Sequence, residues 1–315
     1  MDRRDEIHPG TARREPMASL TPAEREFYSA HSATSDPGEL AELLRALPAN
    51  PEALADAVSG LVLHPVFVTR RRVVCRPESA DDAQSRTVRA VLRRVLSRDS
   101  RPLSVRRAYE QRFVGTCRDY ALLACSIFRE KGVPTRVRVG FATYFVSGFY
   151  EDHWLCEYWE GGRWRLLDAE LDGEARTTYG IDFAPWDVPR DRFLTAGRVW
   201  QAVRAGLLDP MTCGVSFIGI AGAWFVAASV IRDLAALNKR EMLPWDYWGL
   251  GREVNATRTV SDAAAARLDA LAGLVAGPEV DWLALCVTYE TEPGVRVPSV
   301  ILSFPAGVPI EITLA

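Results

Sequence analysis

The chain has 315 residues, of which 48% are hydrophobic and 25% charged, as is typical of a folded protein with a sizeable core. The 38 basic and 41 acidic residues give a formal net charge of -3, which excludes a protein that holds nucleic acid by bulk positive charge. Six cysteines are too few for a disulfide scaffold, and the opening residues contain no apolar signal segment. We therefore expect a cytoplasmic protein with free thiols.

The first hundred residues are predicted to be a tail followed by short helices. Residues 1–34 begin with a polar, arginine-rich run, and we expect them to form a disordered or loosely ordered tail. A helical lead-in is predicted over 35–100, because apolar residues recur there at helical spacing in three segments. The third segment, about 83–98, places Val88, Val91, Leu92 and Val95 on one face.

Residues 101–190 change character and are predicted to form an α+β catalytic core. Residues 117–131 show helical spacing, and Gly132 is positioned to end that helix. Three consecutive strands are then predicted over 135–145, 153–159 and 163–171, and the Gly-Gly turn between the last two favours an antiparallel sheet. In the first strand Arg136 and Arg138 alternate with valines, which predicts one buried and one open face.

Residues 191–315 are predicted to be a mainly helical extension packed on the core. Within it, 211–231 contains no charged residue and is long enough to span a bilayer. Glycines interrupt the first half of this run, and its second half continues into an amphipathic segment. Both features favour a loop that leads into a buried helix, so we expect no membrane contact. The apolar runs 281–290 and 297–304 are predicted to be strands.

Cys117 is a candidate nucleophile because it stands where the sequence becomes helical. Unpaired backbone N–H groups and the helix dipole favour a thiolate there, which predicts a lowered pKa for its thiol. The same N–H groups can stabilise an oxyanion in acyl transfer. The alternative is that Cys117 is an inert buried thiol.

His153 is the one histidine on a predicted strand within this core, whereas His64, before Pro65, fits a capping or core residue. Asp168 ends the neighbouring strand, and a suitable register would let its carboxylate bind one ring nitrogen of His153. The other nitrogen would then face Cys117. Glu157 is a second candidate for orienting the imidazole, but it lies four residues further along the same strand.

Three blocks in this region, GTCRDYALLACSIFREKGVPTRVRVGF, DHWLCEYW and GRWRLLDAELD, resemble the core of the transglutaminase-like superfamily. The resemblance implies a papain-like core, in which a Cys-bearing helix packs on an antiparallel sheet. It also implies that Cys117 is the nucleophile, His153 the general base and acid, and Asp168 the orienting carboxylate. Gln111, six residues before Cys117, has the spacing of a papain-type oxyanion glutamine, and Tyr109 is a further candidate for that role.

The resemblance implies a cysteine-dependent acyl-transfer enzyme, either an amidase or peptidase or a transglutaminase-type acyltransferase. Its substrate would be a protein, a peptide or a carrier-bound acyl group, attacked at an amide, ester or thioester carbonyl. No cofactor and no metal are expected, since the sequence has no CxxC pair and no clustered zinc ligands. The alternative is a non-catalytic binding module that retains the fold.

Overall fold

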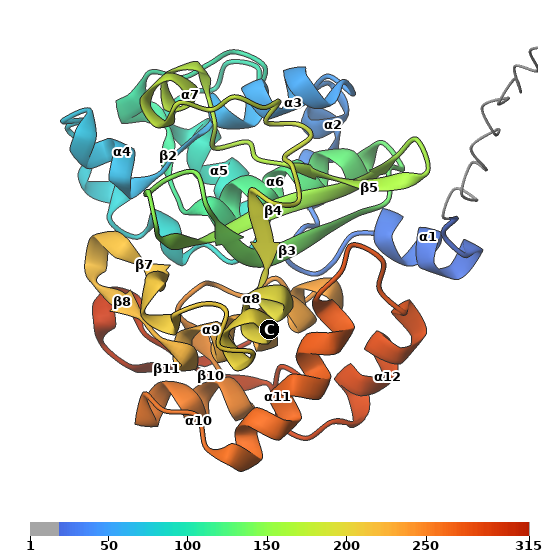
Figure 1. Ribbon diagram of the computed structural model, residues 1–315. Helices are drawn as coiled ribbons and strands as arrows, with labels where there is room; N and C mark the ends of the chain where they lie inside the picture. The colour runs from blue at the N-terminus through green and yellow to red at the C-terminus, as the bar shows by residue number, and fades with distance from the viewer. Residues whose placement is uncertain (1–18, 315) are drawn as a thin grey trace, which may run out of the picture.

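A six-stranded sheet forms the centre of the protein, and the computed structural model describes residues 19–314 around it (Figure 1). The strands follow the order β6-β3-β4-β7-β8, and β5 also pairs with β4. Their bounds are β3 (Thr135–Ala142), β4 (Tyr150–Glu160), β5 (Arg163–Leu167), β6 (Phe193–Thr195), β7 (Cys213–Val215) and β8 (Ile220–Ala221). The pairs β3–β4 and β4–β5 are antiparallel as predicted, whereas β4–β7 is parallel.

Two long helices cover this sheet on opposite sides, as Figure 1 shows for α6 (Cys117–Glu130) and α9 (Ala223–Leu237). Apolar residues of α6 pack with Val137, Val139 and Trp154 of the sheet, while α9 packs with Phe141. The sulfur atoms of Cys125 on α6 and Cys156 on β4 lie 3.3 Å apart. The predicted α+β class, with a Cys-bearing helix on a sheet, is confirmed.

The N-terminal region is helical, as expected, but its order begins earlier than predicted. Helix α1 contains Tyr28, which is fully buried and donates a hydrogen bond to the carbonyl of Leu237 (3.1 Å). The prediction of a loose tail is therefore wrong for this helix, while residues 1–18 lie outside the described part of the chain. The elements are α1 (Pro22–Ser29), α2 (Ala41–Arg45), α3 (Pro51–Ser59), β1 (Val62–Leu63), α4 (Pro65–Arg70), α5 (Val88–Arg98) and β2 (Phe113–Val114).

The C-terminal region completes the sheet as well as packing on it. Strands β6, β7 and β8 come from beyond residue 190, so the boundary predicted there divides a single sheet. A separate small sheet has the order β11-β10-β9. The remaining elements are α7 (Gly173–Tyr179), α8 (Ala196–Arg204), β9 (Asp246–Tyr247), α10 (Gly249–Thr257), α11 (Asp262–Val275), α12 (Trp282–Thr291), β10 (Val300–Ser303) and β11 (Ile310–Thr313).

Two apolar segments of this region fold in different ways. The run 281–290, predicted to be a strand, forms helix α12, because Asp281 caps it by accepting a hydrogen bond from the N–H of Ala284 (3.0 Å). The uncharged run 211–231 forms β7 and β8 before it enters the buried helix α9. Among the described residues, no helix combines the length and apolar character that crossing a membrane requires.

Strand β3 is buried on both faces, which contradicts the prediction of one open face. Arg136 and Arg138 are fully buried, because acidic partners replace the water that they lose. Arg136 pairs with Glu157 at 2.6 Å, and Arg138 pairs with Glu157 at 3.3 Å and with Asp233 of α9 at 3.0 Å. Arg190 is a third partner of Glu157 (2.5 Å). We call these five residues the buried ion cluster.

Candidate active site

Cys117 is the first residue of helix α6, and a capping box fixes that position. The carboxylate of Asp119 accepts a hydrogen bond from the backbone N–H of Thr116 (2.9 Å), and Thr116 caps the helix in return. A first-turn N–H has no acceptor within its own helix, so that of Cys117 is free to meet a ligand. The Cys117 side chain itself is buried, with 6% of the residue exposed.

An opening in the edge of β4 receives the Cys117 sulfur. Strand β3 runs along one edge of β4, while β7 and β5 both pair with the other edge. Strand β7 contacts β4 at Tyr150 and Glu151, and β5 begins its contact only at Cys156. In the stretch between them, the backbone N–H of Trp154 hydrogen-bonds to the Cys117 sulfur. The break between two short strand pairs thus brings the N-terminus of α6 against β4.

His153 stands in this same stretch and is bonded to Asp168. Its Nε2 lies 2.9 Å from Oδ2 of Asp168, which follows the last residue of β5. Asp168 is held in place because it also accepts bonds from the Tyr144 hydroxyl (2.6 Å) and the N–H of Glu170 (2.9 Å). A carboxylate can only accept, so Nε2 of His153 carries the proton and Nδ1 is left with a free lone pair.

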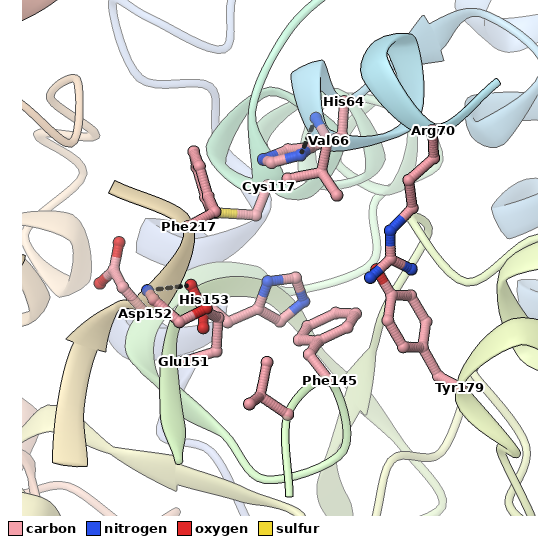
Figure 2. Close-up of a pocket in the computed structure, with 12 residues that line it drawn as sticks. His64, Val66, Arg70, Cys117, Phe145, Glu151, Asp152, His153, Tyr179 and Phe217 are labelled. Carbon is pink, nitrogen blue, oxygen red and sulfur yellow. Dashed lines mark hydrogen bonds between the residues drawn. The ribbon is translucent and has the colours of Figure 1, made fainter. Parts of the chain in front are cut away.

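Cys117 and His153 line one cavity of about 100 Å³ (Figure 2). Apolar side chains form much of its wall, and the ring of Phe145 lies against His153 with centroids 4.9 Å apart. Polar side chains, among them Glu151 and Asp152, line the same cavity. The other lining residues are His64, Val66, Arg70, Val146, Tyr179, Ser216 and Phe217. The cavity therefore has room for a small acyl group next to a thiol and an imidazole.

The electrostatics of the cavity contradict the expected low pKa of Cys117. Burial raises the pKa of this thiol well above its ordinary value, and the carboxylates of Asp152 and Glu170 raise it further. The bond from the Trp154 N–H opposes them but is weaker. Burial alone would lower the pKa of His153, but Asp168 outweighs it and the pKa is raised. The favoured resting state is thus a neutral thiol beside a basic imidazole.

The other sequence candidates lie outside this cavity. Gln111 ends a short turn before β2 and is absent from the cavity wall, as is Tyr109, whose hydroxyl donates to Glu174 (2.9 Å). Strand β2 lies between that turn and Cys117 in the chain. Glu157 cannot orient His153, since the buried ion cluster holds both of its oxygens.

Sequence reasoning missed three titratable residues around the cavity, namely His64, Asp152 and Glu170. Burial raises the pKa of Asp152 to about 7 and that of Glu170 to about 8. Glu170 is nearly buried, and its Oε2 makes no hydrogen bond to any described residue. For Asp152 and Glu170 the only signal was their nearness in sequence to His153 and Asp168. For His64 it was a histidine in a position where helix caps are commonly Ser, Thr, Asp or Asn.

Comparison with protein-family models finds a match over part of this chain. Residues 75–169 match the model of the transglutaminase-like superfamily, and this range contains Cys117, His153 and Asp168. A comparison with curated protein sequences finds no match.

One solved structure, named "a Putative Cysteine Protease from Cytophaga hutchinsonii", is similar at 17% identity over 56% of this chain, with a TM-score of 0.32. The similarity covers 46% of that protein, so the chain spans less than half of its length. The family match over residues 75–169 supports a transglutaminase-like member.

Proposed function

We propose that this protein is a cysteine-dependent acyl-transfer enzyme, with Cys117 as nucleophile, His153 as general base and acid, and Asp168 as orienting carboxylate. One observation carries the proposal. The imidazole of His153 is bonded through Nε2 to Asp168 (2.9 Å), which leaves Nδ1 for the cavity that it shares with Cys117. Three side chains from α6, β4 and the end of β5 thereby supply the parts of a nucleophile, a base and its orienter.

The first half of the reaction forms an acyl-enzyme. The Cys117 sulfur attacks the carbonyl carbon of an amide, ester or thioester, and its proton passes to Nδ1 of His153. Asp168 stabilises the imidazolium that results. When the tetrahedral intermediate collapses, the bond to the leaving group breaks and His153 returns the proton to that group. Because the thiol has a raised pKa, removal of its proton during attack is the step in which His153 contributes most.

The second half releases the acyl group. Water or an amine attacks the thioester carbon, His153 takes the proton of the acceptor, and the Cys117 sulfur leaves and is reprotonated. We propose a protein, peptide or carrier-bound acyl group as the substrate. The nucleophile must stay reduced in this cycle, so the proposal keeps the cytoplasmic setting expected from the sequence.

A second candidate is a binding module without catalysis, and exposed apolar side chains near the cavity favour it. Phe217, which lines the cavity, is 58% exposed, as is Ile218, which follows it in the chain. Exposed apolar groups of this kind suit contact with another protein. The two candidates differ in what they require of the thiol, because a binding module needs no base-assisted Cys117.

Thiol alkylation separates the two candidates. In the full chain with Cys75→Ser and Cys286→Ser, the two more exposed thiols are gone, and the fully buried Cys213 serves as an internal control. Limiting iodoacetamide should label Cys117 before Cys213, and His153→Ala should slow this labelling strongly, because the proton then has no acceptor. Equal labelling rates with and without His153 would remove the chemical basis of the proposal and favour the binding module.

A further inference from the structure

His64 is brought to Cys117 by the pairing of two very short strands. Strands β1 and β2 are parallel, with Val62 opposite Phe113 and Leu63 opposite Val114. The backbone N–H of Gly115 continues this pairing by donating to the carbonyl of Leu63 (3.1 Å). His64 follows β1 directly, just as Gly115, Thr116 and Cys117 follow β2. The two strand ends therefore place an imidazole next to the N-terminus of α6.

The hydrogen bonds of His64 define which ring nitrogen carries its proton. Nδ1 accepts a bond from the backbone N–H of Val66 (3.2 Å) and so caps helix α4. A nitrogen that accepts cannot also carry the proton, so the proton of the neutral ring is on Nε2. Nε2 has no hydrogen-bond partner among the described residues, and the side chain, which lines the cavity, keeps 13% of its surface exposed. His64 thus presents a free N–H donor.

The surroundings of His64 favour this neutral form. Burial and, to a smaller extent, the neighbouring His153 lower the pKa of His64 to about 3, although Asp168 opposes them. The nearest acidic group is Oε1 of Glu170, 3.9 Å from Nδ1, and the ring of Phe217 stands edge-on with centroids 6.2 Å apart. A neutral imidazole donates a hydrogen bond without giving up its proton, so His64 is suited to bind negative charge and unsuited to act as a base.

We propose that Nε2–H of His64 and the backbone N–H of Cys117 together form an oxyanion-binding site. This inference rests on the proposed acyl transfer. When the sulfur attacks, the carbonyl π electrons move onto oxygen, and these two donors bind that oxygen without transferring a proton. In Figure 2 His64 and His153 lie on either side of Cys117, and all three line the cavity. His153 then accepts and returns the proton, while His64 binds the negative charge on the oxygen. His64 takes the role for which the sequence had suggested Gln111.

The proposal is tested by comparing two reactions of the same sulfur. Acylation by p-nitrophenyl acetate passes through an oxyanion, whereas alkylation by iodoacetamide displaces iodide and forms none. His64→Ala should lower the single-turnover acylation rate about 10²–10³-fold, the usual effect of losing one oxyanion donor. The alkylation rate of Cys117 should change little. His64→Gln, which restores an N–H donor, should recover part of the acylation rate.

The controls separate a donor from a structural residue. His64→Asn keeps a side chain that can cap α4, so it protects the fold, and it should lose acylation as His64→Ala does. Unchanged acylation in both variants, or equal losses in acylation and alkylation by folded protein, would overturn the role of His64. If Cys117→Ala retains the acylation of the parent chain, the proposed function fails instead, whatever His64 does.

Discussion

Strand β4 carries two groups of buried charge that are balanced in opposite ways. At Glu157, burial alone would raise the pKa, but Arg136, Arg190 and Arg138 outweigh it and hold the pKa at about 2. Only five residues earlier along the strand, burial raises the pKa of Asp152 to about 7, since Arg232 compensates it only in part. In the ion cluster each carboxylate is paired with arginine, whereas the cavity holds acidic groups without full partners.

This contrast separates a structural site from a reactive one. The ion cluster fixes the sheet against α9 through the pair between Arg138 and Asp233. In the cavity, where compensation is incomplete, the pKa values of the acidic groups stay near neutral pH. Such groups can gain or lose a proton readily at that pH. The same difference separates the proposed base, His153, from the structural residue Glu157, although both are buried on β4.

The largest effect is expected from Asp168→Asn. The amide cannot stabilise the imidazolium of His153 and allows the wrong tautomer, so acylation by p-nitrophenyl acetate should fall by up to about 10⁴-fold. Tyr144→Phe is the matched control, because it removes a 2.6 Å hydrogen bond to Asp168 but leaves the carboxylate. An Asp168→Asn variant that acylates as fast as Tyr144→Phe would contradict the role of Asp168.

In the ion cluster, Glu157→Gln should reduce stability rather than chemistry. It leaves Arg136 and Arg138 buried without their shared carboxylate, which should lower the free energy of unfolding by about 3–5 kcal/mol in urea titrations. The control is Asp182→Asn, which breaks an exposed pair with Arg192 (3.1 Å) and should cost less than about 1 kcal/mol. Similar losses in the two variants would show that the cluster is not compensated as described.

The pH dependence of acylation should reveal the raised pKa of His153. The protonated ring cannot accept the proton of the thiol, so the rate should rise with pH through a midpoint above the ordinary value of 6.5. In Asp168→Asn the midpoint should move down, because the main group that raises the pKa is lost while burial remains. If the acylation rate rises only near pH 9.0, the ordinary pKa of a thiol, or above it, and shows no rise at lower pH, His153 does not act as the base.

The smallest effect is expected from Asp152→Asn. The carboxylate of Asp152 raises the pKa of Cys117, and its own pKa is about 7. The variant should therefore speed alkylation of Cys117 a few-fold above pH 7 and change it little well below pH 7, where Asp152 is already neutral. Equal rates for parent and variant at alkaline pH would show that this carboxylate does not influence the thiol.

Local sequence patterns predicted the centre of the fold but not its edges. Helix α6 and the strands β3, β4 and β5 follow from periodicity, a Gly-Gly turn and a capping signal that lie within a few residues of each other. Strands β6, β7 and β8 have only two or three residues each, too few for any period to be recognised. The run 281–290 is apolar on all sides, and in such runs helix and strand cannot be distinguished by periodicity.

The site was predictable to a similar extent. The sequence pointed to Cys117, His153 and Asp168, and the structure brings the last two within hydrogen-bonding distance. The sequence pattern placed Arg136 and Arg138 on an open face, because it could not show their acidic partners. One of these, Asp233, lies 95 residues from Arg138 in the sequence. The sequence passed over His64 because the pairing of β1 with β2 joins strands 51 residues apart, and two-residue strands give no sequence signal.

The most direct test of the account is to locate the acyl group by peptide mass spectrometry after brief reaction of the full chain with p-nitrophenyl acetate. If Cys117 is the nucleophile and His153 its base, a single acetyl thioester forms on Cys117 and disappears in His153→Ala. Acetylation spread over the more exposed Cys75 and Cys286, or acetylation of Cys117 that persists unchanged without His153, would contradict it.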